Sequence, residues 1–217
     1  PFYNAAEGLG RSPFMARMSN RLTAYDVQTG RLMAEYPPSD DGGEASRLFF
    51  LGPPLVLDDR LYCIAESLGE FRLLVLKVSP EGLQLDWSQS LLNTSSTLMQ
   101  NPTRRMCGLS PSSRNGLLIC PTEGGGVTAI DLQLQAQRLM SQQQQFGGNF
   151  ENRWLESSTM LSERHVVMTL RDVDELHCLN LADGTLAWKK EREEGLFVAA
   201  LYDGKVIVVS RGFVQAY

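Results

Sequence analysis

Side chains that could do acid–base or metal chemistry are few in this sequence and are not grouped by spacing. The two histidines, His165 and His177, both lie in apolar stretches that favour strands. Two histidines without cysteines at ligand spacing do not make a zinc site. Residues 123–128, EGGGVT, are glycine-rich but lack the lysine and the helix that a phosphate-binding loop requires. No Gly-x-Ser-x-Gly turn presents a serine nucleophile either.

Acidic residues stand together at Asp40–Asp41, at Asp58–Asp59 and in the segment 172–175, DVDE. Clustered carboxylates are ligands that Ca²⁺ prefers in proteins. Asp58 and Asp59, however, lie between two apolar runs and are expected to form a hairpin turn. The segment 172–175 is expected to be a solvated loop between two strands. The sequence therefore assigns no catalytic residue and no metal ligand.

The four cysteines have no C-x-x-C spacing and do not fix a redox compartment. Cys107 and Cys120 flank an expected hairpin with its turn near residues 111–116, so a cross-strand disulfide between them is one interpretation. The other interpretation, which we favour, is that the cysteines are buried and pack as small apolar side chains.

The composition indicates a folded chain with a substantial core. Of the 217 residues, 43% are hydrophobic and 21% are charged, which is unlike a disordered chain. The net charge of −5 argues against a nucleic-acid surface, which would need a basic stripe. The longest apolar runs, such as 73–76 and 206–210, are far shorter than the roughly 18 residues that a membrane span needs.

A repeated phrase organises the chain. The segment 176–190, LHCLNLADGTLAWKK, has the same pattern as 22–36, LTAYDVQTGRLMAEY: a strand, an Asp or Asn, a glycine four residues later and a second strand. Looser copies occur at 73–89 and at 127–143, where the glycine is lost and its place is assigned to Ala136. The glycine positions are then 52, 54 and 48 residues apart. The repeated positions are Asp26, Gly30, Gly82, Trp87, Asp131, Asn180, Gly184 and Trp188.

A strand–turn–strand phrase precedes each later copy, and the two phrases together make a unit of four short antiparallel strands. The phrase at 198–210 has Asp203-Gly204 between two apolar runs, a strong hairpin signal. Four-stranded units repeated at this period are typical of β-propeller blades. Within the motif, we expect the Asp or Asn to bond turn N–H groups, the glycine to supply a positive φ, and the tryptophan to pack between blades. The best helical alternative is 132–145, whose glutamines equally suit a solvated connection between blades.

The unit A-x-D-x-x-T-G-x-x-x-W resembles the tryptophan-docking motif of propellers related to pyrroloquinoline quinone (PQQ) dehydrogenases. Residues 24–34 match it except at the tryptophan, 178–188 match its frame, and 76–87 match it more loosely. The segment 51–76 is also similar to large exported planctomycete-type proteins with such repeats. Some members of the family are PQQ-dependent dehydrogenases, which hold PQQ with Ca²⁺, and others only bind proteins. The resemblance therefore implies the fold and leaves the function open.

We expect an all-β chain that forms a β-propeller segment of four-stranded antiparallel blades with PQQ-like repeats and an incomplete ring. The expected pieces are a partial blade at 1–46, blades at about 47–92, 104–145 and 155–194, and a partial blade at 195–217. Because rings in this family have more blades, we expect the natural protein to be longer. The blade faces left exposed at the two ends favour self-association.

The function that we favour is non-catalytic: a scaffold of a larger bacterial protein that presents its faces and loops to protein partners or to the remaining blades of its own chain. No cofactor is expected. The alternative is a fragment of a PQQ-dependent dehydrogenase, with PQQ and Ca²⁺ on the propeller axis, and glycan binding is a third interpretation. The family resemblance implies an exported or periplasmic protein.

The segment 147–154, GGNFENRW, fits the repeat least well. We expect an inter-blade loop there, and the alternative is a functional loop formed by Asn149, Asn152, Arg153 and Trp154. The functional alternative requires Trp154 or Arg153 to point into a polar pocket on the axis.

Overall fold

The computed structural model describes residues 19–38, 43–94, 97–98, 100, 104–105, 108–122, 126–142, 154–155, 158–170 and 173–217. These residues form five antiparallel sheets and very little helix, so the predicted all-β fold is confirmed. Sheet 1 comprises β1 (Leu22–Tyr25) and β2 (Leu32–Tyr36), and sheet 2 comprises β3 (Phe49–Phe50), β4 (Leu55–Leu57), β5 (Arg60–Ser67), β6 (Glu70–Ser79) and β7 (Gly82–Asn93). Sheet 3 comprises β8 (Ser112–Arg114), β9 (Leu117–Pro121), β10 (Gly126–Asp131) and β11 (Ala136–Gln142), and sheet 4 comprises β12 (Ser158–Leu161), β13 (His165–Thr169), β14 (Glu175–Asn180) and β15 (Leu186–Glu191). Sheet 5 comprises β16 (Gly195–Tyr202), β17 (Lys205–Ser210) and β18 (Val214–Ala216), and a 3₁₀ helix, η2 (Glu44–Arg47), lies between sheets 1 and 2 in sequence.

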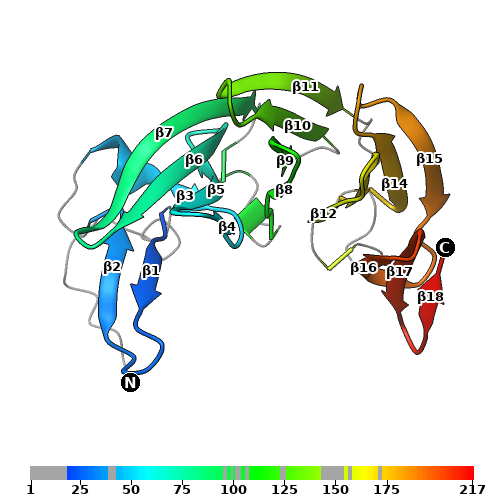
Figure 1. Cartoon of the computed structure of the whole chain (residues 1–217), viewed down its shortest axis with the longest axis horizontal. Helices are drawn as coiled ribbons and strands as arrows, with labels where there is room; N and C mark the ends of the chain where they lie inside the picture. The colour runs from blue at the N-terminus through cyan, green and yellow to red at the C-terminus, as the bar shows by residue number, and fades with distance from the viewer. Residues whose placement is uncertain are drawn as a thin grey trace.

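The sheets follow one another in chain order around an arc, from β1 and β2 at one end to β16–β18 at the other (Figure 1). In sheets 3 and 4, each strand pairs with the strand that follows it in sequence. Four-stranded antiparallel sheets arranged in this way are the blades of a β-propeller, and the arc formed by the described residues does not close into a ring. The predicted blade boundaries themselves stay a prediction. No described helix has the length and hydropathy that crossing a membrane requires.

The core consists of four apolar clusters, and each fills the space between two consecutive sheets. Side chains alternate between the two faces of a strand. In β5, Cys63 and Ala65 therefore pack with Tyr36 toward sheet 1, whereas Tyr62 and Ile64 pack toward sheet 3. The inner strands are consequently buried on both faces, which explains why their sequences are continuous apolar runs rather than alternating ones.

The repeated phrase corresponds to one hairpin geometry, found four times. Each copy has a β-bulge directly after the same residue pair of its two strands. The bulge re-aims the outer strand and increases its twist. The equivalent pairs are Ala24–Ala34, Val75–Trp87, Ala129–Leu139 and Cys178–Trp188.

The structure corrects the glycine position of the degenerate copy. The equivalent of Gly30 (φ 68°) and Gly184 (φ 71°) is Gln135 (φ 49°) and not Ala136, which begins β11. Asp131 accepts turn N–H groups from Gln133 and Leu134 at 2.9 and 3.0 Å. With the turn held in this way, the backbone adopts the left-handed conformation at Gln135 without a glycine. Sequence spacing missed this because a non-glycine residue carries no mark of positive φ.

Other expectations have mixed outcomes. The turns at Asp58-Asp59 and Asp203-Gly204 are confirmed, with positive φ at Asp58, Asp203 and Gly204. The helical alternative for 132–145 is wrong over 132–142, where a turn leads into β11, and 143–145 lie outside the described residues. The expected strand near 14–18 also lies outside them.

The cysteine hairpin has a different register from the expected one. Ser112 pairs with Ile119, which places residue 111 rather than Cys107 opposite Cys120. Cys120 is a free, buried thiol, and Cys107 lies outside the described residues. Burial also raises the pKa of Cys120, and it raises the pKa of Cys63 to about 12 and that of Cys178 to about 11. The three thiols therefore behave as small core side chains and not as nucleophiles.

Replacing Gln135 by glycine is expected to stabilise the chain by about 1 kcal/mol, because glycine adopts a positive φ without the steric penalty of a Cβ. The matched control is Gly30→Gln. An added Cβ at Gly30 would meet no atom within 4 Å, so the expected loss of about 1 kcal/mol comes from the backbone alone. Urea unfolding followed by circular dichroism measures both changes. A Gln135→Gly variant no more stable than the unchanged chain would contradict this explanation.

Candidate functional site

The turn between β5 and β6 has an unusual residue at its tip. Leu68 has φ 53°, and its side chain is 73% exposed. The other described non-glycine residues with positive φ are all polar: Asp58, Asn115, Gln135, Glu193 and Asp203. A leucine in the left-handed region is uncommon and costs about 1–2 kcal/mol. Turn chemistry alone does not explain an apolar side chain that is held strained and exposed.

The turn is anchored from below by a chain of polar contacts. The carbonyl of Gly69 accepts the N–H of Thr94 at 2.7 Å and the hydroxyl of Thr94 at 3.1 Å. Arg104 Nη1 lies 3.4 Å from the Thr94 hydroxyl and donates to Glu66 Oε2 at 2.7 Å. These contacts tie the tip of the turn to a buried ion pair and give Leu68 a fixed position.

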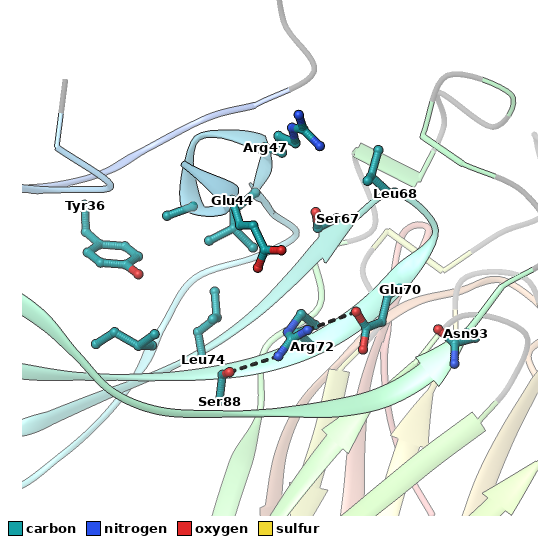
Figure 2. A pocket seen from close by; sticks show the side chains of 13 residues that line it. Tyr36, Glu44, Arg47, Ser67, Leu68, Glu70, Arg72, Leu74, Ser88 and Asn93 are labelled. Carbon is teal, nitrogen blue, oxygen red and sulfur yellow. Dashed lines mark hydrogen bonds and ion pairs between the residues drawn. The ribbon is translucent and has the colours of Figure 1, made fainter. Parts of the chain in front are cut away.

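One cavity, of about 410 Å³, lies between η2 and the strands β5–β7 and is named here the η2 cavity. Figure 2 shows Glu44 and Arg47 of η2 on one side of it and the side chains of sheet 2 on the other. On the sheet side, Arg72 donates to Glu70 Oε2 and to Ser88 Oγ, both at 3.0 Å. The cavity thus has fixed charges of both signs and apolar walls.

A second cavity, of about 420 Å³, lies on the other side of the turn and is named the Glu66 cavity. Its walls include Leu68, Leu98 and the hydroxyl-bearing Ser46 and Thr97. Arg47 and Leu68 line both cavities and are called the ridge. An exposed apolar ridge flanked by two hollows is the shape of a surface that receives side chains of another molecule.

The acidic group of the Glu66 cavity is deeply buried. The side chains of Glu66 and Arg104 are 1% and 0% exposed, and the Arg104 guanidinium carbon lies 5.5 Å from the centre of the Phe71 ring. Glu66 Oε2 accepts from Arg104, whereas Glu66 Oε1 is buried without a hydrogen-bond partner. Leaving a buried acceptor unsatisfied is costly, and more so for a charged group.

The predicted motif residues lie away from both cavities, except that Gly82 and Trp87 belong to β7 of sheet 2. Asp26 accepts the N–H groups of Gln28 and Thr29, and the Thr29 hydroxyl bond holds the pKa of Asp26 below its usual value. Asn180 differs, because its amide donates to the Thr185 hydroxyl at 2.8 Å. The motif polar groups thus hold hairpins together.

The two motif tryptophans lie between sheets, with different burial. Trp87 packs against the core between sheets 2 and 3. Trp188 is 38% exposed and lines a cleft of about 500 Å³ between sheets 4 and 5, together with Tyr202 and His165. Gly82 opens β7 at φ 124°, and Gly30 and Gly184 form the turns described above.

The suspected functional loop contributes a core side chain. Trp154 is 1% exposed and packs with Val167, Val198 and Val208 between sheets 4 and 5. Its indole N–H donates to the main-chain carbonyl of Glu175 at 3.2 Å. Trp154 therefore does not point into a polar pocket, and Asn149, Asn152 and Arg153 lie outside the described residues.

The segment 172–175 contains one ordered polar network. Glu175, the first residue of β14, bonds His177 Nε2 through Oε2 and Lys189 Nζ through Oε1, both at 2.8 Å. The hydrogen bond from His177, followed by that from Lys189, holds the pKa of Glu175 below its usual value. Within the described parts of the chain, no three His, Cys, Asp or Glu side chains are placed to hold a metal ion. No step through Ca²⁺ or PQQ is therefore derived.

Glu175 is expected to make stability depend on pH. Because its pKa is lowered in the folded chain, its contribution is present above its ordinary pKa of 4.5 and is lost as pH falls through the folded value. Glu175→Gln should cost about 0.5–1 kcal/mol at pH 7, since the group is partly solvated, and the difference from the unchanged chain should shrink at pH 3.5. Urea unfolding at the two pH values measures this difference.

The control for that change is Glu163→Gln. Glu163 is 83% exposed and lies 3.8 Å from Arg114, so its replacement should leave stability almost unchanged at both pH values. Equal effects of the two substitutions at pH 7 would mean that the network on Glu175 contributes nothing.

No protein-family model matches the chain, and no curated protein matches it in sequence. Two solved structures share its fold. BamB from Moraxella catarrhalis is 14% identical, with a TM-score of 0.60, and the match covers 92% of this chain and 56% of that one. Sqt1 from Saccharomyces cerevisiae is 11% identical, with a TM-score of 0.62, and the match covers 92% of this chain and 53% of that one. The chain therefore has the fold of a β-propeller segment and spans about half the length of these two propellers.

Proposed function

We propose that this chain is a non-catalytic protein-interaction scaffold whose contact surface is the ridge of Arg47 and Leu68 with the two cavities beside it. The observation that carries the proposal is Leu68, an exposed leucine held at positive φ between two hollows. Strained residues persist where the surrounding structure holds them, and they cluster at binding sites. Burying Leu68 against a partner would give the conformation a use.

The side chains around the cavities suit binding better than catalysis. Arg72 is held by Glu70 and Ser88, and Glu66 is held by Arg104, so neither group is poised to transfer a proton. The ridge joins an apolar side chain to a cation, and its surroundings offer hydroxyl groups and charges of both signs. An apolar centre with a polar surround is the usual anatomy of a protein–protein contact.

A random peptide library displayed on phage and selected on this immobilised chain tests the proposal. We expect enriched peptides whose affinity falls tenfold or more in Leu68→Asp, because an apolar anchor at the centre of a contact carries much of its energy. The matched control is Leu134→Asp, since Leu134 is 74% exposed and lies in the turn before β11. Enrichment of no peptide, or of peptides that bind both variants equally, would contradict the proposal.

Further parts of the proposal come from the repeat resemblance. They are the absence of a cofactor, a location outside the cytoplasm, and contact with other blades or with a second copy through the exposed side chains of sheets 1 and 5. Tyr25, Leu32 and Val214 are among those exposed side chains. A titration with PQQ and Ca²⁺, followed by tryptophan fluorescence, tests the first part. Saturable, Ca²⁺-dependent quenching would contradict it and favour the dehydrogenase alternative.

A further inference from the structure

We infer that the Glu66 cavity receives an aromatic side chain of the partner, tryptophan or tyrosine, whose N–H or O–H donates to Glu66 Oε1. The inference deepens the proposed function and rests on it. Its starting point is the unsatisfied oxygen: Glu66 lines the cavity, its side chain is 1% exposed, and its Oε1 has no hydrogen-bond partner. A ligand that donates a hydrogen bond there removes the cost of the unmade bond.

The charges around Glu66 favour a neutral donor. Arg104 already lies 2.7 Å from Glu66 Oε2, and Arg47 stands at the wall of the same cavity. A lysine or arginine of the partner would approach both guanidinium groups, and like charges in a partly desolvated site repel. An acidic side chain would instead meet the Glu66 carboxylate. A neutral N–H or O–H avoids both repulsions.

The walls of the cavity favour an aromatic ring as the carrier of that donor. Leu68 and Leu98 offer apolar surface, and the cavity volume of about 420 Å³ lies within the range of sites that enclose small ligands. Tryptophan and tyrosine combine a large apolar body with one polar atom, which is why they are enriched at protein contacts. Phenylalanine would fill the same walls and leave Glu66 Oε1 unsatisfied.

The test uses three uncharged probes that need no identified partner: N-acetyl-tryptophanamide, N-acetyl-tyrosinamide and N-acetyl-phenylalaninamide. Each is titrated into the ¹⁵N-labelled chain, and the amide signals are followed by NMR. We expect the first two to bind about tenfold more tightly than the third, since a hydrogen bond to a charged group is worth this much. The signals of Ser46 and Leu68 should shift.

A cavity-filling variant locates the binding without disturbing the ion pair. Ser46→Phe adds a ring inside the Glu66 cavity only and should abolish binding of N-acetyl-tryptophanamide. Ser162→Phe, in the cleft between sheets 4 and 5, is the matched control and should leave binding unchanged. Equal affinities for the three probes, or equal binding to Ser46→Phe and the unchanged chain, would overturn the inference.

The two failures are distinguishable. Selected peptides that depend on Leu68 but ignore Ser46→Phe would leave the scaffold standing and remove the aromatic contact. Probe binding that follows the expected order without any Leu68-dependent peptide would instead support the cavity and remove the proposed ridge surface.

Discussion

Replacing Arg104 by methionine lowers the expected free energy of unfolding by about 3–5 kcal/mol. The substitution leaves the Glu66 carboxylate, 1% exposed, without the guanidinium that lies 2.7 Å from its Oε2. It also removes the contact with the Thr94 hydroxyl, which in turn holds the carbonyl of Gly69. An uncompensated buried charge is among the costliest single changes in a protein. Urea unfolding followed by circular dichroism measures the loss.

Two further variants separate burial from charge. Arg60 makes ion pairs of similar length, 2.7 Å to Asp59 and 2.8 Å to Asp86, but is 37% exposed, so Arg60→Met should cost less than about 1 kcal/mol. The double variant Glu66→Leu/Arg104→Met should recover more than half of the loss, because it leaves no buried charge. If Arg104→Met costs no more than Arg60→Met, the ion pair does not support this part of the fold.

The sequence predicted the blades because their information is local. The turn at Asp203-Gly204 and the Asx turn at Asp26 are written in neighbouring residues whose chemistry fixes the backbone. The strands on either side are apolar and β-branched at positions that become buried between sheets. Repetition of these local signals was enough to indicate a propeller, since few architectures repeat a four-stranded unit.

The candidate site could not be predicted because its information is not local. Glu66 and Arg104 are 38 residues apart, and only the packing of sheet 2 against the segment that follows it brings them together. Leu68 is one leucine among many in the sequence, and its positive φ follows from the two-residue turn that joins β5 to β6. Nothing in the residue type marks either feature, whereas the eye-catching acidic segment 172–175 supplies a structural contact at Glu175.

Trp154 shows the opposite error, in which an unusual segment was given a functional alternative and its described residue proved to be core. Replacing Trp154 by alanine is expected to cost about 3–5 kcal/mol, because the cavity left between sheets 4 and 5 cannot collapse. A Cβ on Gly195 would lie 3.1 Å from the Trp154 ring, so the neighbouring backbone already fits closely around it. The two valine-bearing strands of sheet 5 would lose their largest contact with sheet 4.

The comparison that decides between packing and a special role uses two other variants. Trp188→Ala removes an indole that is 38% exposed and should cost clearly less, since water already reaches it. Trp154→Phe keeps most of the ring volume and loses the hydrogen bond to the Glu175 carbonyl, so about 1–3 kcal/mol is expected. Circular dichroism in urea suits all three variants because it does not depend on tryptophan emission. A Trp154→Ala variant as stable as Trp188→Ala would return the segment 147–154 to consideration as a functional loop, since a buried tryptophan without a packing role would need another reason to be there.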